Sequence, residues 1–191
     1  CEGICYHFFY ENNVFKREEV RVLNCSHEEA DTKIIFHVCN IIANDSDITV
    51  NVRANDTDVF VLLLFHVAQT QSTAKVWMEA GHSYNNTRRY IDISQIINAT
   101  GRAFVNALPA MHAFTGCDFT AAFLNKGKIK AIKLLESMPS YCACFGKLGE
   151  TDRVAEAESC TIENFVCNLY GKKRLQNIDK ARLQIFEERY R

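Results

Sequence analysis

An alternating, β-branched segment followed by an acidic turn and an apolar run limits the folds open to this chain. Residues 48–52, Ile-Thr-Val-Asn-Val, alternate in the manner of a strand. Asp56-Thr57-Asp58 then precedes the apolar segment 59–67. Periodicity alone does not separate a buried strand from a helix there, but the Asp/Thr start and the run of leucines favour a helix to about Gln69. The pattern is a strand followed by a helix, the repeating unit of α/β folds.

The flanking segments extend this pattern. Further strands are expected at residues 20–23, 75–79 and 89–93, the last two joined by a hairpin tip at 81–86. Helices are expected at 27–42 with Ser26 as N-cap, at 95–98, at 101–113 with an interruption at Pro109, at 128–137 and from 161 onward. The order predicts an α/β fold with a parallel sheet and flanking helices, followed by further helices.

Composition narrows the class of protein. The chain has 191 residues, of which 48% are hydrophobic, which suffices for the core of one domain with a small appendage. The net charge of −1 excludes a general polyanion binder, so nucleic-acid binding would need a local basic patch. The longest apolar run is too short to span a bilayer, and no membrane partner is expected. The nine cysteines lack paired Cys-x₂-Cys clusters and are interpreted as core residues of an intracellular, preferentially nuclear protein.

Acidic residues form three groups along the chain. They are Glu28, Glu29 and Asp31 at the start of the first expected helix, Asp56 and Asp58 after a strand, and Asp118 in a Thr-Gly-Cys-Asp-Phe segment. Ligands of open α/β sheets collect at the carboxyl ends of strands, where the first two groups would lie side by side. Taken singly, each group has a simpler interpretation, because acids in a first helical turn favour the helix dipole and Asp56 or Thr57 could be an N-cap.

Taken together, the acids indicate a metal site. Crowded carboxylates repel strongly, so a fold keeps them close only where a cation neutralises them. Hard oxygen ligands suit Mg²⁺ or Mn²⁺. Two such ions about 4 Å apart can activate water and stabilise a leaving phosphate oxygen. The acids therefore predict phosphodiester chemistry.

The motifs resemble, in order and spacing, the XPG/flap-endonuclease branch of the PIN-like superfamily. The matching segments are Glu29-Ala30-Asp31, Asp56-Thr57-Asp58, the 90–97 segment, Phe114-Thr115-Gly116-Cys117-Asp118-Phe119, and 125–131, which resembles a helix–three-turn–helix. The sequence is more similar to PIN-like proteins that include transposon-associated members than to housekeeping flap endonucleases. The resemblance implies a PIN-like fold and a metal-dependent nuclease of flap-endonuclease type, acting on DNA or RNA without a small-molecule cofactor.

Residue roles follow from the resemblance alone. Glu29 and Asp31, with Glu28 as an alternate, would hold a first Mg²⁺ or Mn²⁺ ion, and Asp56, Asp58 and Asp118 a second. Lys126, Gly127, Lys128 and Lys130 would meet the phosphate backbone of nucleic acid; a solvated lysine-rich helix start is the simpler alternative. Asn125 stands where the family has glycine, and asparagine can adopt the left-handed conformation at some cost.

The resemblance also implies that the N-terminal part of the domain is missing. The family's N-terminal half supplies two further aspartates, for which residues 1–19 are too short, and the chain begins with Cys1. We therefore expect a fragment or degenerate copy with an incomplete two-metal site. The expected domains are a partial PIN-like domain at 1–138 and a helical extension at 139–191. Two alternatives stay open: a non-catalytic nucleic-acid or protein interaction module that retains the fold, and an unrelated α/β domain with coincidental acids.

Overall fold

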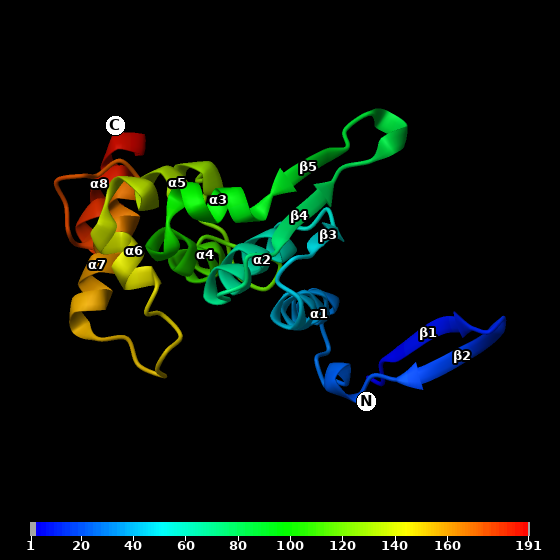
Figure 1. The fold of residues 1–191 in the computed structure, drawn as a ribbon. Coiled ribbons are helices and arrows are strands. Elements are labelled where there is room, and N and C mark those ends of the chain that lie inside the picture. Colours follow the sequence, from blue (N-terminus) through cyan, green and yellow to red (C-terminus); the bar gives the residue numbers. More distant parts are fainter. Residues whose placement is uncertain (1–2, 191) are drawn as a thin grey trace. The chain divides into compact units, whose positions relative to one another are not determined.

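Strand β3 (Thr49–Arg53), helix α2 (Thr57–Gln69) and strand β4 (Lys75–Ala80) form the central α/β unit of the chain. The computed structural model describes residues 3–190 (Figure 1). β3 and β4 are parallel and in register from Thr49 opposite Lys75 to Arg53 opposite Glu79. β5 (Arg89–Asp92) pairs antiparallel with β4, which gives a small mixed sheet in the order β3-β4-β5. The predicted α/β class, the helical assignment of 59–67 and the β4–β5 hairpin are thus confirmed.

Helix α1 (Ala30–Asn44) precedes this sheet and packs against α2 and β3. Its buried residues, Ile35, Val38 and Ile42, share one face at helical spacing. The helix begins three residues later than expected from Ser26, so the prediction of an N-cap there is wrong. Glu29 occupies the N-cap position, with extended backbone, and makes no side-chain capping bond. Of the first acidic group, only Asp31 therefore lies in the first helical turn.

The strand expected at 20–23 does not form, and a β-hairpin precedes this segment. β1 (Tyr6–Glu11) and β2 (Val14–Glu19) pair antiparallel and form a separate two-stranded sheet. Asn12 and Asn13 join them with φ of 51° and 62°, the left-handed pair that a two-residue hairpin turn requires. The run 20–23 is instead a turn with the 3₁₀ helix η1 (Arg21–Leu23), in which the Leu23 amide donates to the Val20 carbonyl.

The remaining elements are helical. The chain divides into two units, Cys1–Ile97 and Asn98–Arg191, and this boundary differs from the one expected at 138. α3 (Ile93–Thr100) runs across the boundary, and η2 (Ser83–Asn85) lies in the hairpin tip. The second unit contains α4 (Arg102–Phe114), α5 (Lys128–Ser137), α6 (Pro139–Phe145), α7 (Glu156–Leu169) and α8 (Ile178–Tyr190). Because α4 packs on α6, and α5 and α6 pack on α7, these helices share one core.

Pro109 does not interrupt α4, contrary to the sequence prediction. Proline removes one hydrogen bond from a helix interior and strains the preceding turn. Val105, Ala107, Leu108 and Met111 are all buried on this helix, and their packing holds it continuous. None of the helices within residues 3–190 combines the length and apolar character needed to cross a membrane.

The core of the second unit is aromatic. The Phe165 ring lies 4.9 Å from Phe145, 5.2 Å from Tyr141 and 6.4 Å from Phe114, between ring centroids. The Tyr141 hydroxyl donates to the Asn164 side-chain oxygen, and the Asn168 amide donates to the Tyr141 oxygen at 2.6 Å. Helix α6, which carries Tyr141, was not expected from the sequence.

Candidate metal centre

The start of α2 positions two of the predicted acids. Asp56 directly follows β3 and the Ala54-Asn55 link, with extended backbone (φ −88°, ψ 134°), and is the N-cap of α2. Its Oδ1 accepts a hydrogen bond of 2.8 Å from the Asp58 amide. The capping interpretation of Asp56 is therefore confirmed. Asp58 lies in the first turn of the same helix, where the helix dipole favours a carboxylate.

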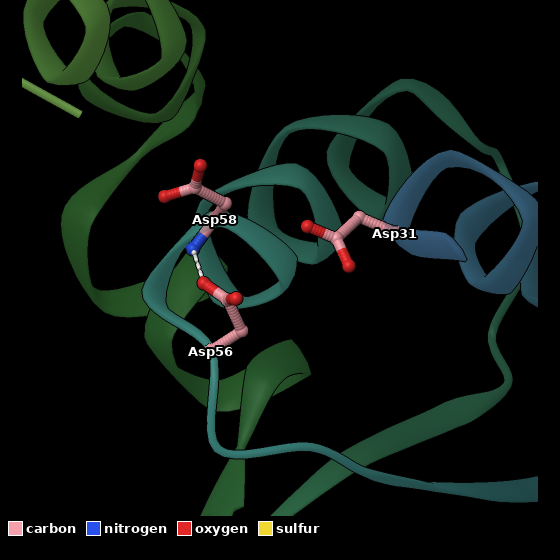
Figure 2. Close-up of side chains that lie close together, drawn as sticks. All are labelled: Asp31, Asp56 and Asp58. Atoms are coloured by element: carbon pink, nitrogen blue, oxygen red, sulfur yellow. Dashed lines mark hydrogen bonds between the residues drawn. The ribbon is translucent and has the colours of Figure 1, made fainter. Parts of the chain in front are cut away.

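Asp31 approaches these two residues from the first turn of α1 (Figure 2). One carboxylate oxygen from each of Asp31, Asp56 and Asp58 lies within 4.8 Å of the others. Asp31 and Asp58 are half-buried and Asp56 is exposed. Within residues 3–190, this is the one group of three or more acidic, histidine or cysteine side chains at metal-binding spacing. We call it the Asp31–Asp56–Asp58 triplet.

The charges of the triplet are partly balanced by the backbone. Each helix N-terminus acts as roughly +0.5 charge, and the triplet lies at the N-termini of α1 and α2 together. Three ionised carboxylates less this compensation leave a charge of about −2. That excess equals the charge of one divalent cation, and an all-carboxylate donor set suits Mg²⁺ or Mn²⁺. The triplet is thus chemically suited to one hard divalent ion.

Glu28 and Glu29 do not belong to the triplet. Both are exposed and precede α1. Glu29 contributes its backbone instead, because its carbonyl accepts from the Thr32 hydroxyl at 3.0 Å and from the Lys33 amide at 3.4 Å. The resemblance had implied a first ion held by Glu29 and Asp31, with Glu28 as an alternate, and of these residues only Asp31 belongs to the triplet.

Asp118 lies in the second unit, in the exposed turn after α4. The Thr120 hydroxyl closes this turn by accepting from the Cys117 amide at 3.0 Å and donating to the Ala113 carbonyl at 2.5 Å. Gly116 has φ of 108°, and a Cβ there would meet Ala122 at 2.7 Å, so the turn requires glycine. The Gly-Cys-Asp motif therefore has a structural role, and a metal role for Asp118 stays a prediction.

The lysines predicted to contact nucleic acid have different surroundings in the structure. Lys126 lies over the Tyr170 ring at 4.8 Å, and Lys130 is exposed. Partial desolvation, and then the neighbouring positive charge of Lys126, lower the pKa of Lys130. An anion such as phosphate would relieve the repulsion between these two lysines. Asn125, as its position suggested, takes the left-handed conformation with φ of 56°.

Lys128 is engaged within the protein. Its half-buried ammonium donates to the His112 carbonyl at 2.9 Å and to the Gly116 carbonyl, at the C-terminus of α4. A cation there satisfies the last carbonyls of the helix and complements its dipole. Gly127, the N-cap of α5, has an ordinary φ of −80° and open space around its α-carbon. The Lys128 ammonium is thus bonded to carbonyl groups of the protein, and a nucleic-acid role for Gly127 and Lys128 stays a prediction.

Replacing Lys128 with methionine is expected to destabilise the second unit by about 1–3 kcal/mol, because charge-assisted hydrogen bonds to carbonyls are lost while the apolar stem is kept. Urea unfolding followed by circular dichroism measures the change. Lys130→Met is the matched control and should stay within about 0.5 kcal/mol of the parent. Equal stabilities of the two variants would show that the Lys128 contacts contribute nothing.

Glu79 is a charged residue that the sequence analysis missed. It is buried near the end of β4, with its Oε1 3.1 Å from Arg88 Nε and 3.7 Å from Arg53 Nε. This oxygen makes no hydrogen bond of good geometry among the described residues, so the contacts are ion pairs, while Asn51 Nδ2 donates to Oε2 at 3.2 Å. The signal for Glu79 in the sequence was an acid within the otherwise apolar segment 76–80.

The fold and the site define an α/β chain with a small mixed sheet and an acidic triplet at two helix N-termini. No protein-family model matches the sequence, and neither the curated proteins nor the solved structures contain a match. The PIN-like resemblance therefore stays a hypothesis that rests on the motifs themselves.

Proposed function

We propose that the chain is a metal-dependent nuclease of flap-endonuclease type, which hydrolyses phosphodiester bonds of DNA or RNA. The convergence of Asp31, Asp56 and Asp58 within 4.8 Å carries this proposal. N-capping explains Asp56, and the helix dipoles favour Asp31 and Asp58, but neither effect requires the two helices to bring their acids together. A cation shared by the three carboxylates supplies that reason.

In this proposal the three aspartates hold a Mg²⁺ or Mn²⁺ ion, which supplies Lewis acidity toward a phosphate oxygen and lowers the pKa of water. The Asp56 carboxylate is oriented by its bond to the Asp58 amide, so the N-terminus of α2 is ordered before an ion binds. The resemblance also implies metal roles for Glu28 or Glu29 and for Asp118, and these stay predictions. Lys126 and Lys130 would contact the nucleic-acid backbone without reading its sequence.

Calorimetric titration with Mn²⁺ tests the site directly. The parent protein is expected to bind Mn²⁺, and Asp58→Asn should weaken binding at least about tenfold, since one negative ligand is lost. Asp92→Asn is the matched control, because Asp92 Oδ1 caps α3 through the Gln95 amide at 2.8 Å and is outside the triplet. Equal Mn²⁺ affinities of the parent, Asp58→Asn and Asp92→Asn would overturn the assignment.

A non-catalytic interaction module is the second candidate, favoured by the β1–β2 hairpin. Tyr6, Phe8 and Tyr10 of β1 share one face with Phe15 and Arg17 of β2, as the register requires. The aromatic residues are exposed, and the Arg17 guanidinium lies 4.6 Å from the Tyr6 ring centre. Exposed aromatic residues with arginine are typical of protein interfaces. This observation favours a binding role for the hairpin whether or not the triplet is catalytic.

A further inference from the structure

The outer edge of β3 is open. β3 is an edge strand in the order β3-β4-β5. The Ile48 carbonyl accepts from the Lys75 amide at 3.0 Å, and the Ala54 amide donates to the Glu79 carbonyl at 3.1 Å, so the even-numbered positions of this segment face β4. Backbone groups alternate along a strand, and those of Thr49, Asn51 and Arg53 therefore point to the outer edge. Within residues 3–190, no strand pairs with that edge.

A groove runs along the same edge. It has a volume of about 440 Å³ and is formed by α1 on one side and by β3 on the other. Its lining residues are Lys33, Ile34, His37, Val38, Ile41, Val50, Asn51, Val52 and Arg53. Ile41 is 39% exposed although it is a large apolar residue on a helix that packs against the sheet. An added strand would cover Ile41 and pair the free backbone groups at the same time.

The charges that line the groove favour an acidic peptide as its ligand. Lys33 and Arg53 contribute positive charges to the lining, and no acidic residue lines the groove. Arg53 is already 3.7 Å from Glu79 but keeps most of its side chain exposed, and Lys33 comes from the facing helix. A bound strand that places carboxylates beside these groups would be attracted, and one that carries lysines would be repelled.

We propose that the β3 edge is a docking site for an extended acidic–apolar peptide of a partner protein, which adds as a strand to the sheet. Main-chain hydrogen bonds to Thr49, Asn51 and Arg53 supply the affinity, and alternate side chains of the peptide supply the specificity. Apolar residues of the peptide pack on Ile34 and Ile41, and its carboxylates face Lys33 and Arg53. The groove lining does not include the three aspartates of the triplet, and the proposal does not depend on metal.

Titration of the ¹⁵N-labelled protein with a blocked octapeptide of alternating valine and aspartate tests the proposal. The amide signals of Thr49, Asn51 and Arg53 are expected to shift most, and the same peptide with lysine in place of aspartate should bind at least about tenfold more weakly. Lys33→Glu should reduce affinity for the acidic peptide by a similar factor. Lys75→Glu, on the exposed start of β4 and outside the groove, is the matched control and should bind normally.

Thr49→Pro gives an independent variant. Proline is tolerated at an edge position whose amide does not pair within the sheet, so the β3–β4 ladder should survive and the amide spectrum should stay dispersed. Loss of binding in this variant supports strand addition. Shifts confined to other surfaces, equal binding of the acidic and basic peptides, or no shift at millimolar peptide would each overturn the proposal.

Discussion

Asp58→Asn is expected to reduce Mn²⁺-supported cleavage of DNA or RNA by at least about a hundredfold. Residues that merely support a metal ligand cost 10–100-fold on mutation, and loss of a direct ligand should cost at least the upper value. The purified protein is incubated with labelled flap, duplex and single-stranded substrates, with and without Mn²⁺, and cleavage rates are compared. Asp31→Asn should behave in the same way, because its carboxylate would reach the same proposed ion from α1.

The choice of substitution at Asp56 separates its two roles. Asp56→Ala removes the bond to the Asp58 amide as well as the charge, and loss of such a cap costs about 0.5–2 kcal/mol. Asp56→Asn keeps a capping oxygen and should fold as well as the parent while losing cleavage. Asp92→Asn, which alters a cap outside the triplet, should cleave normally. Parent-like cleavage by both Asp58→Asn and Asp31→Asn would rule out the triplet as the reaction centre.

Thermal melting of the same variants in the absence of metal gives a second readout. Two unit charges 4.8 Å apart repel by about 1 kcal/mol in water and by roughly 3.5 kcal/mol at an effective dielectric constant of 20. The helix-dipole contribution lost with Asp58 is smaller, about 0.3–1 kcal/mol. Asp58→Asn removes this repulsion, so the variant should gain less in melting temperature than the parent on addition of Mn²⁺.

Phe165→Ala is expected to destabilise the second unit by about 3–5 kcal/mol. The side chain is 0% exposed and contacts the rings of Phe114, Tyr141 and Phe145. Removing it leaves a cavity among three aromatic rings that belong to two other helices, α4 and α6, and these rings cannot collapse into the space without moving their backbones. Urea unfolding followed at the helical signal measures the change.

Phe119→Ala is the matched control for this prediction. Phe119 belongs to the same unit and is 81% exposed, so the same substitution there should change the free energy of unfolding by no more than about 0.5 kcal/mol. If Phe165→Ala were no more destabilising than Phe119→Ala, the assignment of Phe165 to an aromatic core formed by α4, α6 and α7 would be refuted.

Local patterns predicted much of the fold. The alternation of 48–52, the apolar stripe of α1 and the Asp56 cap are all local signals, and the structure places elements where they indicate. The β1–β2 hairpin was missed because its turn uses Asn12-Asn13 instead of an asparagine–glycine pair. Helix α6 was missed because Pro139 at its start and a length of seven residues give little periodicity to detect.

The sequence predicted the part of the acidic site that depends on local structure, but not the part that depends on helix packing. Asp56 and Asp58 are placed by one local capping turn, which sequence shows directly. The approach of Asp31 depends on how α1 packs against α2, a contact between helices that no local pattern encodes. The engagement of Lys128 with α4 is likewise a contact across 12 or more residues of chain, whereas the resemblance had implied a contact with nucleic acid.

The hydrogen bonds among Tyr141, Asn164 and Asn168 have a consequence for how the helical unit assembles. Contacts between phenylalanine rings are tolerant, because a helix that slides by one turn can exchange one apolar neighbour for another at small cost. The three polar groups cannot be exchanged in this way, since a slip would leave a buried hydroxyl and two amides without partners. Misaligned packings of α6 on α7 are thereby penalised by the loss of these hydrogen bonds.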